Sequence, residues 1–357
     1  MGSCTRQRRR RYSASNTVTT GHARSEAPAP VEATLKLERA SDDDSAERGE
    51  PLQLEAARCC VCGHDDATPV AIGEDFEYRS SPDQFLALRC RDCGLVYLKL
   101  RPATSEYDRI HAPVYRDLNS ARETSGLPDL VRRRVEARRV VRWCRSLPAG
   151  ARILDIGRGD TLRLDALRKS GSPDWELERM DASEVEERVS ATTDTYDLVL
   201  LIGVIEHVDD PPALLKAASE LLRPGGRAVV VTENTATLSF RMFGRRYWGG
   251  YDFPRHWHLF DEKSLRSLAG AVGFDVERQS TLVRPVTWVS SIRNALTDLG
   301  GPAWLVNRFT SASPVSMAAF TLFDWLQQLA GHGGLLRAVL RKPDRVAGGS
   351  GGPDATA

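Results

Sequence analysis

The stretch "ARILDIGRGDTLRLDAL" at residues 151–167 constrains the fold more than any other part of the chain. A short apolar segment precedes a glycine-containing turn, and an apolar–polar pattern typical of a helix follows it. Glycines in such a turn permit positive φ angles and let a ligand approach the backbone closely. A corner of this kind between a strand and a helix commonly binds a nucleotide-like cofactor. Here Arg158 stands between two glycines, and Thr161 occupies the place expected for a third.

Strands and helices are predicted to alternate after this corner. The segment 196–208, "YDLVLLIGVIEHV", contains a nearly continuous apolar run, which is typical of a strand buried on both faces of a parallel sheet. A helix is predicted over 209–226, a strand over 227–234, and a helix over 260–274 that Asp261 caps and Gly273 closes. The sequence therefore predicts an α/β fold with a doubly wound, mostly parallel, Rossmann-like sheet, whose ligand lies at the carboxyl ends of the strands.

A closing hairpin is expected next, from residues 274–280 and 281–290. The segment "PVSMAAFTLFDWLQQLAGHGGLLRAVLRK" at 314–342 has apolar residues at helical spacing. We therefore expect a C-terminal helical extension over residues 291–343, which supplies core packing or a dimer contact.

Seven cysteines are present, and four of them form two pairs, each with a two-residue spacer: Cys59 with Cys62, and Cys90 with Cys93. The spacer lets both thiolates of a pair reach one ion, and the glycine after each second cysteine lets the backbone turn back toward the sulfurs. Four thiolates in two such turns favour a structural zinc site. Residues 68–79 and 84–90 are plausible strands of a small zinc ribbon, and Cys60 and His64 are candidate substitute ligands.

Four segments, in this order, resemble the class I S-adenosylmethionine-dependent methyltransferases. They are "ILDIGRGD", "YDLVLLIGVIEHVDDP", "LLRPGGRAVVV" and "GYDFPRHWHLFDEKSLRSLAGAVGF", within residues 130–290. A zinc-ribbon segment of the form "CxxCG…CxxCGLVYL" ahead of this domain also occurs in a bacterial subset, including methyltransferases of sugar and natural-product pathways. The resemblance implies methyl transfer from S-adenosyl-L-methionine to a small hydroxylated metabolite, such as a sugar or natural-product intermediate.

By this resemblance, Asp155, Gly157 and Gly159 would line the methionine end of the cofactor. The N-terminus of the following helix favours an anionic group, here the carboxylate of the cofactor. Arg158 either pairs with that carboxylate or points into water, and the sequence leaves both interpretations open.

The chain departs from the family between residues 168 and 196. The family normally places there a strand ending in the acidic residue that holds the ribose, and then a helix and a third strand. Residues 175–183, "WELERMDAS", fit the second strand, which makes Asp181 the ribose-binding acid, and equally the third, which places Asp181 near the adenine. Either way about one helix and one strand are missing, so a catalytically degenerate binding or regulatory protein is the alternative function.

Two histidines are the candidate catalytic residues. His207 follows a predicted strand at the ligand edge of the sheet, and the resemblance places Glu206 and His207 toward the active site. A histidine can accept the proton of a hydroxyl acceptor, or it can only shape the pocket. His256 lies in the aromatic segment "RYWGGYDFPRHWHLF", which suits either an acceptor pocket or packing. Glu206, His207, His256 and His258 could also bind a metal, although no spacing requires it.

Composition sets the remaining expectations. The net charge of +1 gives no field that would favour nucleic acid, and no apolar run is long enough for a membrane span. Methylation of RNA or protein is therefore the third-ranked function. No secretory signal is recognisable, so a cytoplasmic protein is expected, with a small-molecule acceptor as its partner and a homodimer as a further option. The expected segments are a disordered tail (1–53), the zinc ribbon (54–105), the methyltransferase domain (106–290), the helical extension (291–343) and a flexible tail (344–357).

Overall fold

The computed structural model describes residues 49–111, 127–157, 162–170, 174–191 and 195–344. The sequence predictions for Arg158, Gly159 and Thr161, for most of the N-terminal tail and for nearly all of the C-terminal tail fall outside the described residues.

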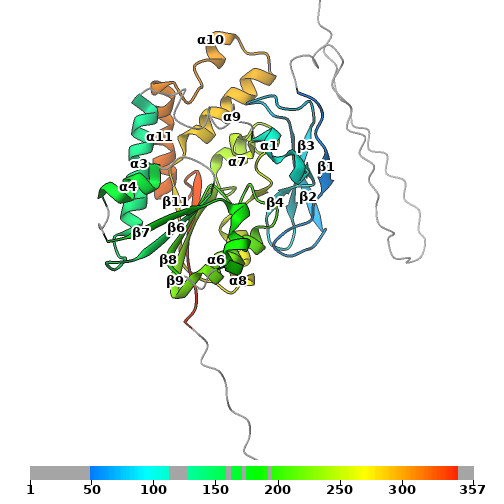
Figure 1. Ribbon diagram of the computed structural model, residues 1–357. Helices are drawn as coiled ribbons and strands as arrows, with labels where there is room; N and C mark the ends of the chain where they lie inside the picture. Colours follow the sequence, from blue (N-terminus) through cyan, green and yellow to red (C-terminus); the bar gives the residue numbers. More distant parts are fainter. Residues whose placement is uncertain (1–48, 112–126, 158–161, 171–173, 192–194, 345–357) are drawn as a thin grey trace, which may run out of the picture. The chain divides into compact units, whose positions relative to one another are not determined.

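A six-stranded sheet forms the centre of the chain (Figure 1), in the order β11-β12-β9-β8-β6-β7. Its strands are β6 (Arg152–Ile156), β7 (Glu176–Met180), β8 (Tyr196–Ile202), β9 (Leu222–Glu233), β11 (Asp275–Leu282) and β12 (Leu335–Arg341). The pairs β6–β7, β6–β8 and β8–β9 are parallel, whereas β12 runs antiparallel to both of its neighbours. This order confirms the doubly wound, mostly parallel fold.

Helices cover both faces of the sheet, and each face has its own apolar core. One core joins the sheet to α5 (Val185–Ala191), α6 (Pro211–Leu221) and α8 (Glu262–Ala271). The other joins it to α3 (Leu127–Cys144) and α4 (Leu162–Ser170). Because β8 contributes Val199 to the first core and Leu198 to the second, it is buried on both faces, as its apolar run predicts.

The ends of α8 are those that the sequence predicts. Asp261 caps the helix and forms a capping box with Ser264, and Gly273 follows its last turn with a φ of +83°.

A second, antiparallel sheet, in the order β10-β4-β3-β2, contains the predicted ribbon. Its strands are β2 (Ala67–Gly73), β3 (Phe85–Cys90), β4 (Val96–Leu98) and β10 (His258–Leu259). The strand β10 comes from the segment that follows β9, so the ribbon is hydrogen-bonded to the rest of the fold at Tyr97–His258 and Val96–Leu259. A two-stranded sheet of β1 (Leu54–Ala56) and β5 (Leu100–Pro102) adjoins it in sequence.

The remaining helical elements lie between these strands. They are η2 (Thr104–Glu106), α1 (Tyr107–Ile110), η3 (Ala182–Glu184), α7 (Leu238–Phe243), η4 (Gly249–Tyr251), α9 (Pro285–Asp298), α10 (Ala303–Val306) and α11 (Pro314–Leu329). No described helix is long and apolar enough to cross a membrane.

Two sequence predictions near the C-terminus are wrong. Residues 281–290 do not form the second strand of a hairpin, because β11 continues to Leu282 and α9 begins at Pro285. The true antiparallel partner of β11 is β12, which lies inside the segment predicted to be wholly helical. Side chains of β12 alternate between half-buried and buried, which is the two-residue period of a strand.

The short segment between residues 168 and 196 corresponds to a sheet that ends at β7 in the described part of the chain. Since β7 pairs in parallel with β6, residues 176–180 are the second strand, which settles the two alternatives for "WELERMDAS". In the described part of the chain no strand pairs with the outer side of β7, so the sheet ends there. Residues 182–191 form η3 and α5, and β8 is the next described element.

Candidate functional site

The four cysteines of the two pairs come together as the spacing predicts. Their sulfur atoms all lie within 4.8 Å of one another, and the cross-pair distances Cys59 Sγ–Cys93 Sγ and Cys62 Sγ–Cys90 Sγ are each 3.3 Å. Cys90 ends β3, and Cys93 lies in the turn between β3 and β4. Four sulfur ligands in two turns suit a closed tetrahedral zinc site.

The two candidate substitute ligands have other partners. Cys60 lies beside the cluster, with its Sγ 3.5 Å from His258 Nδ1. His64 is exposed, and its Nδ1 lies 2.5 Å from Asp92 Oδ2. A second set of potential ligands, Cys62, His64 and Asp92, is mostly exposed.

Asp155 and Gly157 lie at the carboxyl end of β6, where a parallel sheet places its ligand. The side chain of Asp155 is 1 % exposed, and Arg163 of α4 forms an ion pair with it at 3.3 Å. Gly157 has a φ of +144°, and a Cβ on it would lie 2.9 Å from Val204 Cγ2. Only glycine fits here without a shift of that neighbour.

Two further side chains at this edge of the sheet come from β7 and from the residue that follows it. Arg179 donates two hydrogen bonds to the carbonyl oxygen of Gly157, at 3.0 and 3.3 Å. Asp181, directly after β7, accepts hydrogen bonds from the backbone and hydroxyl of Ser183 and caps η3. Asp181 therefore occupies the end of the second strand, the position from which the family resemblance assigns ribose binding.

Glu206, His207 and His256 form a compact group beyond the end of β8. One ligating atom of each lies within 4.8 Å of those of the other two, and the two imidazole rings are 4.7 Å apart. Backbone carbonyls orient both rings: His207 Nδ1 lies 3.1 Å from Arg255 O, and His256 Nδ1 lies 2.8 Å from Gly250 O. Each Nδ1 is therefore the donor, and each Nε2 keeps a lone pair.

Burial dominates the protonation of this group. Removal from water lowers the pKa of His207 and of His256 to about 3, because the low-dielectric interior disfavours the charged imidazolium. The same cause raises the pKa of Glu206 to about 7. Its Oε2 is buried and has no hydrogen-bond partner among the described residues. At neutral pH the cluster therefore has two neutral imidazoles beside a carboxyl group near its titration midpoint.

Sequence reasoning missed one pair of residues at this edge. Glu233, the last residue of β9, is 2 % exposed and forms an ion pair with Arg284. Burial raises the pKa of Glu233 to about 7, and the guanidinium opposes that rise. The two residues are far apart in sequence, so no local spacing could reveal the pair.

The aromatic segment turns out to be mainly packing. Trp248, Tyr251 and Trp257 are each 1 % exposed and belong to an apolar core shared with ribbon residues such as Phe85. Of the residues that the sequence suggested for an acceptor pocket, the structure thus brings His256 to the cluster and places these aromatic rings in the core. His258 lies in β10 beside Cys60, outside the group of Glu206, His207 and His256.

Sequence comparisons with known proteins find a methyltransferase domain. A protein-family profile described as "Methyltransferase domain" matches residues 130–279. The chain is 32 % identical over 113 residues to a ubiquinone biosynthesis O-methyltransferase of Aeromonas salmonicida, covering 26 % of this chain and 48 % of that protein. It is 30 % identical over 171 residues to the protein of the same name from Cereibacter sphaeroides, covering 40 % of this chain and 68 % of that protein.

The match therefore spans about half the length of the first of these relatives and two thirds of the second. A solved structure of a SAM-dependent methyltransferase from Archaeoglobus fulgidus matches at 16 % identity with a TM-score of 0.39, covering 64 % of this chain and 98 % of that chain.

Proposed function

The chain belongs to the class I S-adenosylmethionine-dependent methyltransferases, and from this premise we propose that it methylates a hydroxyl group of a small metabolite. The observation that carries the proposal is the group of Glu206, His207 and His256 beside the Asp155–Gly157 corner, at the carboxyl edge of one parallel sheet. A sugar or natural-product intermediate is the proposed acceptor class.

The residues at this edge fit the cofactor. S-adenosylmethionine supplies a methyl group already activated on a sulfonium. Asp155 offers a buried carboxylate for its ammonium group, and Asp181 offers a half-buried one for its ribose hydroxyls. The absence of a Cβ at Gly157 keeps the backbone open to close approach. Glu206, with an unpartnered buried oxygen, completes the proposed cofactor-binding set, together with Arg158 and Gly159.

His207 is the proposed proton acceptor. Its Nε2 lone pair is free because its Nδ1 donates to Arg255 O. A base with a pKa of about 3 is weak toward an ordinary hydroxyl. The hydroxyl becomes strongly acidic, however, as its oxygen gains the methyl group and positive charge, so a weak base suffices late in the reaction. His256, whose ring lies against that of His207, would orient the acceptor.

Zinc at Cys59, Cys62, Cys90 and Cys93 has a structural role in this proposal. The thiols supply a full set of four ligands, which leaves no open position for catalysis.

Calorimetric titration with S-adenosylmethionine and S-adenosylhomocysteine tests the site. We expect micromolar binding that Asp155→Ala abolishes and that Asp165→Ala, on the partly exposed side of α4, leaves unchanged. Labelled methyl transfer to a panel of hydroxylated acceptors then tests the reaction. Absence of binding by folded protein would overturn the proposal.

The alternative, a catalytically degenerate binding protein, is favoured by two observations. Among the described residues the sheet ends at β7, and Arg163 already partners Asp155. Cofactor binding without transfer to any acceptor on the panel would support this alternative.

A further inference from the structure

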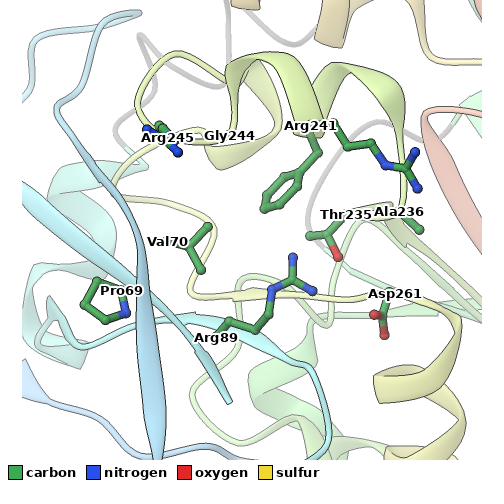
Figure 2. A pocket seen from close by; sticks show the side chains of 10 residues that line it. Pro69, Val70, Arg89, Thr235, Ala236, Arg241, Gly244, Arg245 and Asp261 are labelled. Atoms are coloured by element: carbon green, nitrogen blue, oxygen red, sulfur yellow. The ribbon is translucent and has the colours of Figure 1, made fainter. Parts of the chain in front are cut away.

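A cavity of about 450 Å³ lies away from the histidine cluster, between the ribbon and the segment that follows β9. Figure 2 shows its lining: Arg89 of β3 extends into it from the ribbon, whereas the side chains of Arg241 in α7 and Arg245 in the turn after it lie at opposite sides of the cavity. Its volume is in the range of small-molecule sites. It therefore has room for a ligand larger than a single ion.

Three arginines give the cavity its charge. Arg89 is half-buried, and Arg241 and Arg245 are exposed. Within the ranges that the structure describes, no carboxylate forms an ion pair with any of the three, whereas Arg246 and Arg255 of the same segment pair with Asp298 and Asp75. Asp261 is the single acidic side chain in the described lining, and it is held by Ser264 as the cap of α8. The lining thus carries an excess of two positive charges.

The remaining lining is suited to a hydroxylated ring. Asp261 and Thr235 present oxygen atoms, and the hydroxyl of Thr235 donates to Phe260 O, which leaves its own lone pairs available as acceptors. The ring of Phe240 supplies an apolar wall, with the Arg89 guanidinium 5.5 Å from its centroid. A guanidinium presents a planar fork of donors that matches phosphate oxygens.

We propose that this cavity is a binding site for a phosphate-bearing polyol of the sugar-phosphate class. The guanidinium of Arg89 binds the phosphate group, Arg241 and Arg245 at the rim add electrostatic attraction, and Asp261 and Thr235 accept hydrogen bonds from sugar hydroxyls. This site is separate from the Asp155 corner and does not depend on methyl transfer.

The test is calorimetric titration of the full chain, at low salt and without a methyl donor, with glucose 6-phosphate, inorganic phosphate and glucose. We expect glucose 6-phosphate to bind about tenfold more tightly than inorganic phosphate, and glucose to bind least. Arg89→Gln should weaken glucose 6-phosphate binding about tenfold or more, because a direct contact is lost. Arg241→Gln and Arg245→Gln should weaken it about twofold to threefold each, because exposed rim charges are screened.

Arg241 and Arg245 are exposed, so their variants keep the test valid if Arg89→Gln fails to fold. Arg278→Gln is the matched control, because Arg278 is an exposed arginine of β11 outside the cavity lining. Absence of binding of both phosphate probes at millimolar concentration would overturn the proposal. So would equal loss in Arg278→Gln, or equal affinity for glucose 6-phosphate and inorganic phosphate.

Discussion

Two groups of potential metal-ligating side chains, the cysteine cluster and the histidine cluster, reach similar compactness by different routes. The four thiols come from two local turns, each set by a two-residue spacer. Glu206, His207 and His256 come from two segments that meet only when β8, its following loop and the loop before β10 have packed. Local spacing therefore predicts the cysteine cluster, whereas the histidine cluster depends on tertiary structure.

The two clusters also differ in what holds them. The two cysteine turns and the end of β3 position the sulfurs, and Cys59, Cys90 and Cys93 are buried in the apolar core. Backbone carbonyls fix both imidazole rings, and burial keeps them neutral, so the histidine cluster is organised without an ion.

The largest expected effect concerns the cysteine cluster. Cys90→Ser should remove the zinc, about one ion per chain in the unmodified protein, and lower the free energy of unfolding by about 5 kcal/mol or more. The whole fold should be affected, because the ribbon strand β4 pairs with β10. Metal analysis and thermal unfolding measure both. Cys60→Ser, beside the cluster but outside it, should keep its zinc; a fully zinc-loaded Cys90→Ser would contradict the assignment.

The next effect concerns the histidine cluster alone. His207→Gln should lower kcat/KM for methyl transfer by about 10²-fold to 10³-fold, because the proton acceptor is lost. Zinc content should stay unchanged, which separates the two clusters. Steady-state kinetics with His64→Gln as the control, an exposed histidine, provide the measurement. An unaltered rate would remove His207 from the reaction.

A smaller effect appears in the pH dependence of stability. The pKa of Glu206 is raised to about 7 in the folded chain, from 4.5, so folding takes up a proton between these values. Stability from this group is therefore lost as pH rises through the window, at up to about 1.4 kcal/mol per pH unit. Buried histidines such as His207, with the pKa lowered to about 3, make the chain more stable as pH rises toward about 6.5. Their contribution is the same in the unmodified chain and in a Glu206 variant, so it cancels when the two are compared.

Glu206→Gln removes the contribution of the carboxyl group. The free energy of unfolding of the variant, relative to the unmodified chain, should consequently increase from pH 5 to pH 7 in urea titrations. Glu187→Gln, on exposed α5 surface, should show no such trend. A flat difference for Glu206→Gln would show that its carboxyl group titrates normally.

The smallest effect tests the edge of the cysteine cluster. His64→Ala breaks an exposed contact with Asp92, so the free energy of unfolding should change by less than about 1 kcal/mol, with zinc retained. Loss of the metal in this variant would instead make His64 a ligand.

Local signals account for most of what the sequence predicted correctly. Asp261 and Gly273 mark the ends of α8 because capping and positive φ are properties of single residues. The misassigned strand β12 has no such marker, since "LLRAVLR" contains good helix formers and is too short for its period to decide. The segment forms a strand because it pairs with β9 on one side and with β11 on the other. The Glu233–Arg284 pair and the arginine-lined cavity likewise depend on contacts between distant segments.

The position of β12 has a consequence for how the protein is made. It follows every other described element in the chain, yet it lies between β9 and β11 in the sheet, where Leu335 pairs with Glu233 and with Leu282. During translation, β9 and β11 leave the ribosome long before their shared neighbour, with their hydrogen-bonding edges uncovered. The nascent chain therefore carries an exposed sheet edge until the last strand arrives, which is the stage at which a chaperone has most to protect.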